Sequence, residues 1–249
     1  MVRQFGEYFV SSIQQIVETI DSEELWSYDN QNLYPSIHEF RLLSLSDLAV
    51  MVKSLDNRSN NNEILNSKIL KEVFVTCGHV ILNFINTSLR SSKIPDLLKI
   101  STVVPIPKVN NTIKADEFRP INILLPIKKL LELVVYDQVM DHIDKNEILM
   151  NTQSGFRIKY SCETALQLSL FKFRSELDNN NDVVVVFLDL KRAFETIDRN
   201  ILLTKLEGYG IGGNVLEWFK DYLLNRKQQV RIDDITSSAI SVNIGVPQV

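Results

Sequence analysis

The hydrophobic pattern of the chain is most regular in one stretch, where a continuous apolar run gives way to helical spacing. Residues 183–188 read Val-Val-Val-Val-Phe-Leu, and β-branched residues at this density are typical of a fully buried strand. Asp189 follows the run, and apolar residues return at helical spacing over residues 191–206. The pattern predicts a buried strand, an acidic residue at its carboxyl end, a turn and then a helix.

Two interpretations of Asp189 are open on this stretch alone. In open α/β sheets, chemistry tends to lie beyond the carboxyl ends of strands, and a hard cation such as Mg²⁺ prefers carboxylate oxygens and substrate phosphates. The alternative is that Asp189 caps the following helix by accepting a hydrogen bond from the backbone of its first turn.

The segments on either side of this stretch alternate between helical periodicity, strand-like runs and polar breaks. A strand containing Pro105 and Pro107 fits an edge position, because proline cannot donate to a strand ladder. Glycines at 208–213 end one helix, and Asn214 can cap the next. We predict helices over 2–26, 44–55, 64–89, 127–143 and 162–177, loops over 27–36 and 56–62, and strands over 101–108, 228–232 and 239–244.

Composition narrows the class of protein. The chain has 249 residues, 45% of them hydrophobic, which is enough for one large domain or two small ones. A net charge of -4 provides no general basic field, so a nucleic-acid groove would have to be locally basic. Cys77 and Cys162 lie far apart with neither disulfide nor zinc spacing, which favours a reducing compartment. The apolar runs are short and interrupted by charges, so we expect no membrane span.

Six short segments occur in an order that resembles a known family. In sequence they are VVPIPK, FRPINILLPIKKLLE, QSGFR, VFLDLKRAFETID, the Gly-Ile-Gly-Gly stretch with WFKDYLLNRKQQVRI, and GVPQ. Together they resemble the reverse-transcriptase domain of a non-LTR (LINE-type) retrotransposon. The resemblance covers residues 101–248, and residues 82–99 resemble the helix that precedes the first strand of that domain.

The resemblance implies an α+β fold, namely the fingers and a partial palm of a right-hand polymerase preceded by helical segments. Residues 1–81 would form a helical N-terminal extension, and residues 82–249 would form the fingers and a truncated palm. The implied reaction is template-directed nucleotidyl transfer, in which a primer 3′-hydroxyl attacks the α-phosphate of a dNTP with help from two Mg²⁺ ions. RNA template, DNA primer and dNTP are the implied partners, and the implied location is intracellular and nuclear.

The resemblance also assigns roles to individual residues. Asp189 matches the first metal-binding carboxylate, and the carbonyl of Leu190 would face the same ions. Phe194 matches the aromatic residue beneath the sugar, where it would exclude a ribose 2′-hydroxyl. Lys108 and Arg119 match the cations that grip the triphosphate, and arginine suits bidentate contact with phosphate.

Three further residues are assigned in the same way. Gln248 matches the glutamine near the nucleotide and template, and Gln153 and Arg157 belong to a loop resembling one that contacts template. Simpler interpretations exist for several of these residues. Lys108 could be a surface lysine after a proline-rich strand, and Arg119 could pair with an adjacent acid at a gain under about 1 kcal/mol.

The sequence also departs from the family pattern. The family's Tyr-x-Asp-Asp hairpin, which carries further metal-binding carboxylates, does not occur here, and Glu195 replaces the usual aspartate. Because one carboxylate makes a poor two-metal site, we expect no polymerase activity from this chain alone. The alternative is a non-catalytic remnant that binds RNA or a protein through small basic clusters at 128–129, 191–192 and 226–227. A third possibility is a marginally stable product whose open strand edge after Ile244 promotes aggregation.

Overall fold

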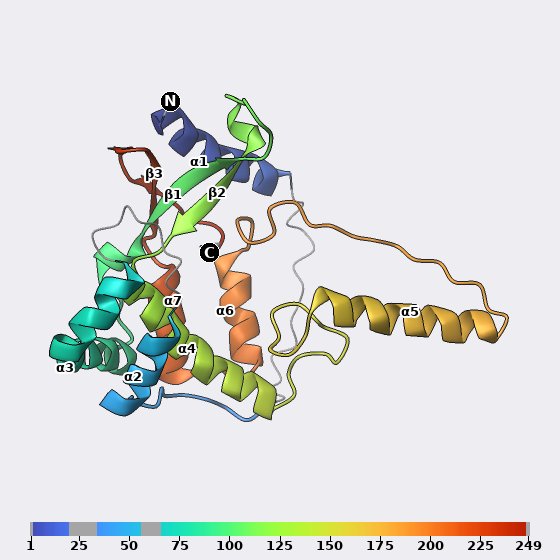
Figure 1. Cartoon of the computed structure of the whole chain (residues 1–249), viewed down its shortest axis with the longest axis horizontal. Coiled ribbons are helices and arrows are strands. Elements are labelled where there is room, and N and C mark those ends of the chain that lie inside the picture. The colour runs from blue at the N-terminus through green and yellow to red at the C-terminus, as the bar shows by residue number, and fades with distance from the viewer. Residues whose placement is uncertain (1, 20–33, 56–65, 248–249) are drawn as a thin grey trace. The chain divides into compact units, whose positions relative to one another are not determined.

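The computed structural model describes residues 2–19, 34–55 and 66–247, and combines helices with a mixed five-stranded sheet (Figure 1). The chain forms two compact units, Met1–His142 with Arg192–Val249, and Ile143–Lys191. The helices are α1 (Val2–Glu18), α2 (Leu45–Ser54), α3 (Ser67–Ser91), α4 (Pro126–Lys145), α5 (Cys162–Asp178), α6 (Arg199–Gly208) and α7 (Gly213–Leu223), with 3-10 turns η1 (Asp96–Lys99) and η2 (Ala115–Glu117). The strands are β1 (Ile100–Pro107), β2 (Phe118–Ile123), β3 (Lys227–Ile232), β4 (Ile235–Thr236) and β5 (Ile240–Ser241).

The sheet has the order β2-β1-β3-β4, and β5 also pairs with β3. β1 and β2 form an antiparallel hairpin, whereas β1 and β3 run parallel, with Val103 opposite Val230. β1 is therefore an internal strand, and the prediction of an edge strand is wrong. The two prolines are tolerated because β3 pairs only with residues 100–103, so Pro105 and Pro107 lie where β2 is the sole neighbour.

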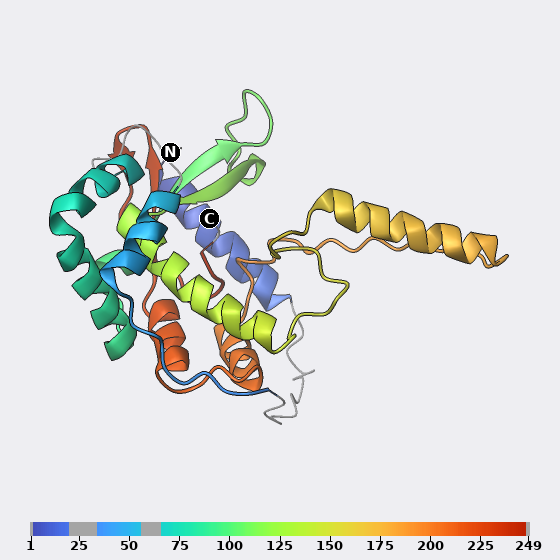
Figure 2. The same ribbon diagram turned by 60° about the horizontal axis from the view of Figure 1, so that its bottom comes forward.

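A small core joins the first helix to this sheet. Phe5 and Phe9 of α1 are buried together with Val103 and Val230, on the face of the sheet that α1 crosses (Figures 1 and 2). The rings of Phe5 and Phe118 meet edge-on, with their centroids 4.8 Å apart, a favourable aromatic geometry. Since the N-terminal helix covers the face, residues 2–18 belong to the same compact unit as the hairpin.

A larger core lies among α2, α3, α4 and α7, which gather on one side of the sheet in Figures 1 and 2. Trp218 of α7 is almost fully buried in it, stacks on Tyr222 at 5.2 Å and donates from Nε1 to the Ser88 hydroxyl at 3.2 Å. Each polar atom carried into this core by Trp218 and Ser88 thus has a partner, as buried polar groups require.

One helix in the described part of the chain, α3, is long and apolar enough to cross a membrane by length and composition alone. A single helix of this kind is weak evidence, because the core helices of globular proteins pass the same test. Four of its leucine and isoleucine side chains are buried in the large core: Leu70, Ile81, Ile85 and Leu89.

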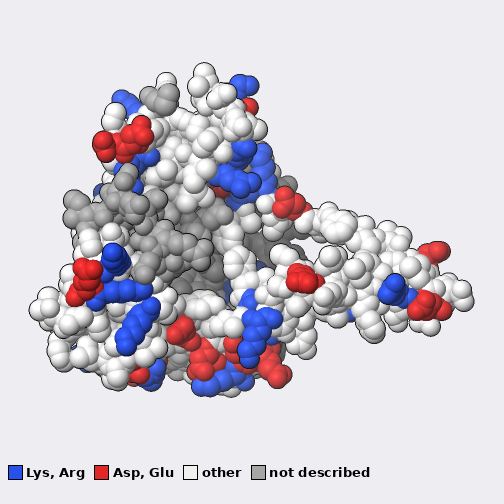
Figure 3. Space-filling model, viewed as in Figure 1, with Lys and Arg blue, Asp and Glu red and all other residues white. Residues whose placement is uncertain are grey.

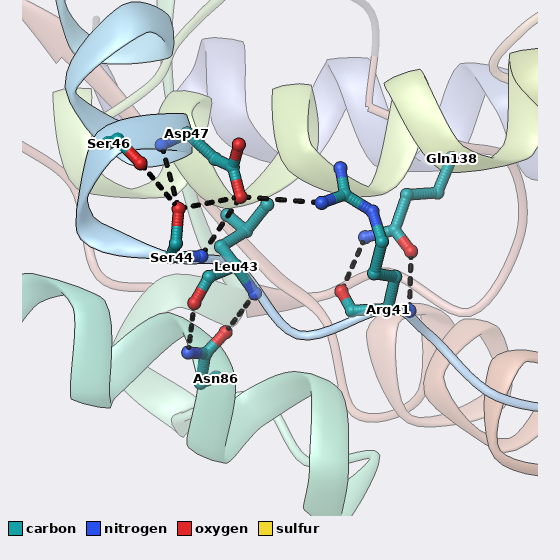
Figure 4. Close-up of polar contacts among 7 residues, drawn as sticks. All are labelled: Arg41, Leu43, Ser44, Ser46, Asp47, Asn86 and Gln138. Atoms are coloured by element: carbon teal, nitrogen blue, oxygen red, sulfur yellow. Dashed lines mark hydrogen bonds and ion pairs between the residues drawn. The ribbon is translucent and has the colours of Figure 1, made fainter.

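The extended segment before α2 is held by side-chain amides rather than by a strand (Figure 4). Gln138 of α4 bonds both main-chain groups of Arg41, at 2.7 and 3.2 Å, and Asn86 of α3 does the same for Leu43, at 2.9 Å for each bond. Ser44 then begins α2 with a capping box, which confirms the predicted capped helix. The backbone groups of this irregular segment are thereby satisfied within the packed unit.

The predicted buried strand at 183–188 is wrong. These residues are extended but pair with no strand among the described residues. Val183 is half-buried and the other side chains are exposed, with 91% of Phe187 accessible. The hydrophobic pattern identified a segment suited to strand pairing, but a strand forms only where another strand can pair with it. The strands that do pair, β1, β2, β3, β4 and β5, all belong to the other unit. The capping interpretation of Asp189 is also wrong, because α6 begins at Arg199 and its cap is Asp198, which accepts from the amides of Asn200 and Ile201.

Other expectations are met in part. The helix expected over 2–26 ends at Glu18, and the remainder of that range from residue 20 lies outside the described residues, as does the loop expected at 56–62. The hairpin partner expected at 239–244 is reduced to β5. The cap expected at Asn214 is wrong, because α7 begins at Gly213 after Gly212 and has no side-chain cap. The division expected between residues 81 and 82 falls inside α3, and its separation of roles stays a prediction.

The packing of α1 gives a direct test. Replacing Phe9, which is only 1% exposed, with alanine should lower the free energy of unfolding by about 3–5 kcal/mol, because a buried aromatic side chain and its contacts are lost. Denaturant unfolding measures the effect, and Gln14→Ala on the exposed face of the same helix is the control, expected within about 0.5 kcal/mol of wild type. Equal costs for the two variants would contradict the described packing of α1.

Candidate functional site

Two segments far apart in the sequence lie side by side in the first unit. The amide of Val246 donates to the carbonyl of Phe194 at 2.8 Å, and the amide of Gly245 donates to that of Ile197 at 2.8 Å. We call these segments the 192–198 turn and the 244–247 loop. Their backbone contact places half-buried Phe194 against the Gly-Val-Pro sequence that leads to Gln248, which itself lies outside the described residues.

Gly245 is required at this contact for two reasons. Its φ is +75°, in the left-handed region that residues with a side chain rarely adopt. A Cβ built on it would also lie 2.3 Å from the carbonyl oxygen of Glu195. Only glycine therefore lets the loop approach the turn this closely.

Arg199 clamps the same loop from the start of α6. Its Nε donates to the carbonyl of Gly245 at 2.9 Å, Nη2 to Ile244 at 3.3 Å and Nη1 to Leu223 at 2.8 Å. Burial, together with the charge of Arg226, lowers the pKa of Arg199 to about 10. Sequence reasoning missed this residue, although a cation at the first position of a helix, where the helix dipole disfavours positive charge, was an available signal.

Arg192 links the 192–198 turn to the N-terminal helix. Its Nη1 donates to the hydroxyl of Ser12 at 2.6 Å, its guanidinium lies 6.0 Å from the centre of the Tyr8 ring, and its Nε is 3.8 Å from Glu195. Burial raises the pKa of Glu195, while the charges of Arg192 and Lys108 oppose that rise. The turn is thus held by α1 on one side and by the 244–247 loop on the other.

Lys108 and Arg119 project from one face of the β1–β2 hairpin. Ile106 pairs with Arg119, and the amide of Lys108 donates to the carbonyl of Glu117 at 2.8 Å, so the two cations occupy neighbouring positions with the same orientation. The Lys108 ammonium donates to the carbonyl of Asp116 at 2.8 Å, while Arg119 is exposed. Within the described ion pairs, none joins Arg119 to Asp116 or Glu117, so its guanidinium is available to a ligand.

The other predicted site residues belong to the second unit and are described within it. Asp189 and Leu190 are exposed in the extended segment after α5. Gln153 and Arg157 lie in a loop that they help to hold: Gln153 donates to the carbonyl of Gly155 at 3.2 Å, and the Arg157 guanidinium lies 4.4 Å from the centre of the Tyr160 ring. Their contact with a template stays a prediction.

The fit of a magnesium site can be assessed from its donor set. Across residues 2–19, 34–55 and 66–247, no group of three or more His, Cys, Asp or Glu side chains comes together to hold a metal ion. Asp189 offers a single carboxylate, whereas two Mg²⁺ ions that also bind substrate phosphates need several oxygen ligands from the protein. The described residues therefore do not by themselves fit a two-metal site, and no metal-dependent step follows from their geometry.

A group of buried charged and polar side chains lies where α4, α7 and β1 meet. Arg226 donates to the Ser101 hydroxyl and to the carbonyl of Tyr222, both at 3.0 Å, and Tyr222 donates to Glu132 at 2.6 Å. Lys128 is 3% exposed, and its ammonium is 3.9 Å from Glu132 with no hydrogen-bond acceptor among the described residues. Burial, and secondarily the charge of Arg226, lowers the pKa of Lys128 to about 8, so this cation is costly to hold.

Charges on the surface do not form one basic field. On the face shown in Figure 3, lysine and arginine side chains gather in small groups interleaved with aspartate and glutamate. Two of the basic clusters expected from the sequence, at 128–129 and 226–227, are not surface clusters, because Lys128 and Arg226 are both buried. Any attraction for nucleic acid on this face must be local.

Comparison with known proteins places these segments in context. The sequence profile described as "Reverse transcriptase (RNA-dependent DNA polymerase)" matches residues 106–248. The "Probable RNA-directed DNA polymerase from transposon BS" of Drosophila melanogaster is 23% identical over 253 residues, covering 98% of this chain and 26% of that protein. The "RNA-directed DNA polymerase from mobile element jockey" of the same organism is 24% identical over 164 residues, 66% of this chain and 18% of that protein. The chain thus spans about a quarter or less of the length of these relatives.

The turn–loop contact predicts the effect of adding one methyl group. Gly245→Ala should lower the free energy of unfolding by at least about 2 kcal/mol, since the left-handed backbone alone costs about 1–2 kcal/mol and the new Cβ meets the Glu195 carbonyl. Gly155→Ala, where a Cβ meets nothing within 4 Å, is the matched control and should change stability by less than about 0.5 kcal/mol. If Gly245→Ala unfolds like this control in urea, the close approach of loop and turn is wrong.

The buried ammonium of Lys128 predicts a pH dependence of stability. The pKa is about 8 in the folded chain and 10.5 when unfolded, so between these values the unfolded chain binds more protons and stability rises with pH. The penalty is complete below pH 8, on the order of 2–3 kcal/mol. Lys128→Met should therefore be more stable than wild type at pH 7, and this advantage should shrink by pH 9.5.

Urea unfolding at pH 7 and pH 9.5 measures this difference, and Lys129→Met, at the exposed neighbouring position, is the control. The control should show no such pH-dependent gain. A Lys128→Met variant that is less stable than wild type at pH 7 would show that the ammonium has a partner that stabilises it.

Proposed function

We propose, because the chain belongs to the reverse transcriptase (RNA-dependent DNA polymerase) family, that it supplies the fingers and first part of the palm of a non-LTR retrotransposon polymerase. The resemblance recognised in the sequence is confirmed by the family match and by the two transposon relatives. The proposed reaction is RNA-templated nucleotidyl transfer from dNTPs to a DNA primer. A nuclear site of action is part of this proposal.

The observation that carries the proposal is the contact between the 192–198 turn and the 244–247 loop. Two segments that the resemblance places around the incoming nucleotide are hydrogen-bonded to each other through the backbones of Phe194 and Val246. Chance similarity of short segments would not require this proximity. In the proposed site, Phe194 lies beneath the sugar and rejects a 2′-hydroxyl by crowding. The resemblance also assigns Gln248, which lies outside the described residues, to the nucleotide and template.

The hairpin cations supply the proposed binding of the triphosphate. Lys108 and Arg119 share one face of the hairpin, opposite the face that carries Phe118, which α1 covers. An arginine fork can bind two phosphate oxygens at once, and a lysine adds a mobile point charge. Together they would bind and orient the triphosphate so that the α-phosphate faces the primer hydroxyl.

The resemblance would assign magnesium to Asp189 and the Leu190 carbonyl, but the described residues do not fit a two-metal site, so the proposal gives the ions no step. The proposal assigns binding and orientation of the triphosphate to Lys108 and Arg119, and sugar selection to Phe194. The expectation that this chain alone does not extend a primer stays a prediction.

The proposal is tested by removing the hairpin cations. The affinity of the chain for dTTP is measured with an RNA template annealed to a DNA primer, in Mg²⁺, for wild type and for Lys108→Ala/Arg119→Ala. Each charge-assisted hydrogen bond contributes about 1.5–3 kcal/mol, so we expect dTTP affinity to fall about 100-fold or more in the double variant. Arg90→Ala/Lys129→Ala, which removes two exposed cations of α3 and α4, should leave it within about twofold.

Two results would contradict the proposal. Equal dTTP affinity for wild type and for Lys108→Ala/Arg119→Ala would remove the hairpin from the nucleotide site. A wild-type chain that binds the hybrid with a steep salt dependence but does not bind dTTP would favour the RNA-binding remnant instead.

A further inference from the structure

Arg199 is a half-buried cation whose hydrogen-bond partners carry no formal charge. The side chain is half-buried, and the three acceptors that it reaches are main-chain carbonyls, of Leu223, Ile244 and Gly245, rather than carboxylates. Burying a cation without a charged partner costs free energy that an apolar side chain would not. What an arginine adds is a rigid, planar set of donors that fixes several acceptors in one geometry.

Arg199 and its acceptors come from three separate parts of the first unit. Arg199 stands at the start of α6, Leu223 ends α7, and Ile244 with Gly245 begins the 244–247 loop. One guanidinium therefore sets the distance of the loop from both helices. Bonds to the carbonyls leave the amides of Gly245 and Val246 free to donate to the 192–198 turn, at 2.8 Å each.

The loop is thus held on both sides of its backbone. On one side the amides face the carbonyls of Ile197 and Phe194, and on the other the carbonyls face Arg199. Because Gly245 has no side chain, the loop can approach the carbonyl of Glu195 closely. The same backbone bond to Val246 holds Phe194 in the 192–198 turn.

We infer that Arg199 is a positioning residue for the nucleotide: by holding the carbonyls of Ile244 and Gly245, it fixes the 244–247 loop against the 192–198 turn, and so holds Phe194 in place for the sugar of an incoming deoxynucleoside triphosphate. The inference rests on the proposed function and deepens it, because it assigns a role to a residue with no direct contact to the substrate.

The first measurement tests the clamp itself. Hydrogen exchange of the Gly245 and Val246 amides is compared in wild type, Arg199→Met, which keeps the apolar stem, and Arg199→Lys, which keeps a donor. We expect exchange of these two amides to accelerate about tenfold or more in Arg199→Met, and to an intermediate degree in Arg199→Lys, while amides within α7 keep their protection. Unchanged exchange in Arg199→Met would overturn the inference.

The second measurement tests the role toward nucleotide. Using dTTP and the same RNA–DNA hybrid, we expect the dTTP dissociation constant to rise about tenfold in Arg199→Met, with partial rescue in Arg199→Lys. Affinity for the hybrid alone should stay within twofold. Lys205→Met, which removes an exposed cation from the same helix, should change neither value.

The outcomes separate this inference from the proposed function. If wild type binds dTTP and Arg199→Met accelerates amide exchange without weakening dTTP, the proposed function stands and the positioning role is wrong. If wild type fails to bind dTTP, the proposed function fails and the positioning role fails with it, whereas the exchange data still decide whether the clamp exists. A loss of hybrid affinity equal to the loss of dTTP affinity would show general disruption and would also overturn the inference.

Discussion

Parallel pairing of β1 with β3 is the constraint on which the first unit depends. It joins residues 100–103 to residues 227–230, and every neighbouring feature is built on that register. The face that it creates is covered by Phe5 and Phe9, and the residue before β3, Arg226, reaches across to Ser101 in β1. The same register brings the end of the chain back beside the 192–198 turn, because the strand order leaves β5 and the 244–247 loop on that side.

Two buried charged side chains of this unit, Asp221 and Lys128, differ in how well neighbouring groups compensate their charge. Asp221 is buried at a cost, but the amide of Ile94 at 2.8 Å and the ammonium groups of Lys93 and Lys99 at 3.0 Å more than offset it, so its pKa is lowered. Lys128 has no comparable set of partners among the described residues, and its pKa is lowered in the direction that burial dictates. Asp221 therefore ties η1 to α7, whereas the burial of Lys128 lowers the stability of the fold.

Local signals in the sequence predicted part of the local structure. Ser44 caps α2 as expected, because a hydroxyl at that position needs only the next turn of backbone, which the sequence itself supplies. The expected cap at Asn214 does not form, because α7 begins one residue earlier, at Gly213. Non-local structure was less accessible. The run at 183–188 has the composition of a strand but pairs with no other strand in the part of the chain that the structure describes, and Arg199 acquires its role from carbonyls contributed by distant segments. The order of the family segments predicted that Phe194 and the 244–247 loop belong together, which periodicity alone could not have indicated.

The order of α1 and the strands that it covers has a consequence for synthesis of the chain on the ribosome. The helix emerges before β1 and β3, yet Phe5 and Phe9 are buried against Val103 and Val230, which those two strands supply. Until both strands have emerged, the two aromatic side chains have no completed sheet to cover. Contacts that close over so long a stretch of chain form slowly, because the entropy of the intervening residues must first be lost. The nascent chain therefore carries an exposed aromatic face until β3 has been made, and is prone to aggregate in that interval.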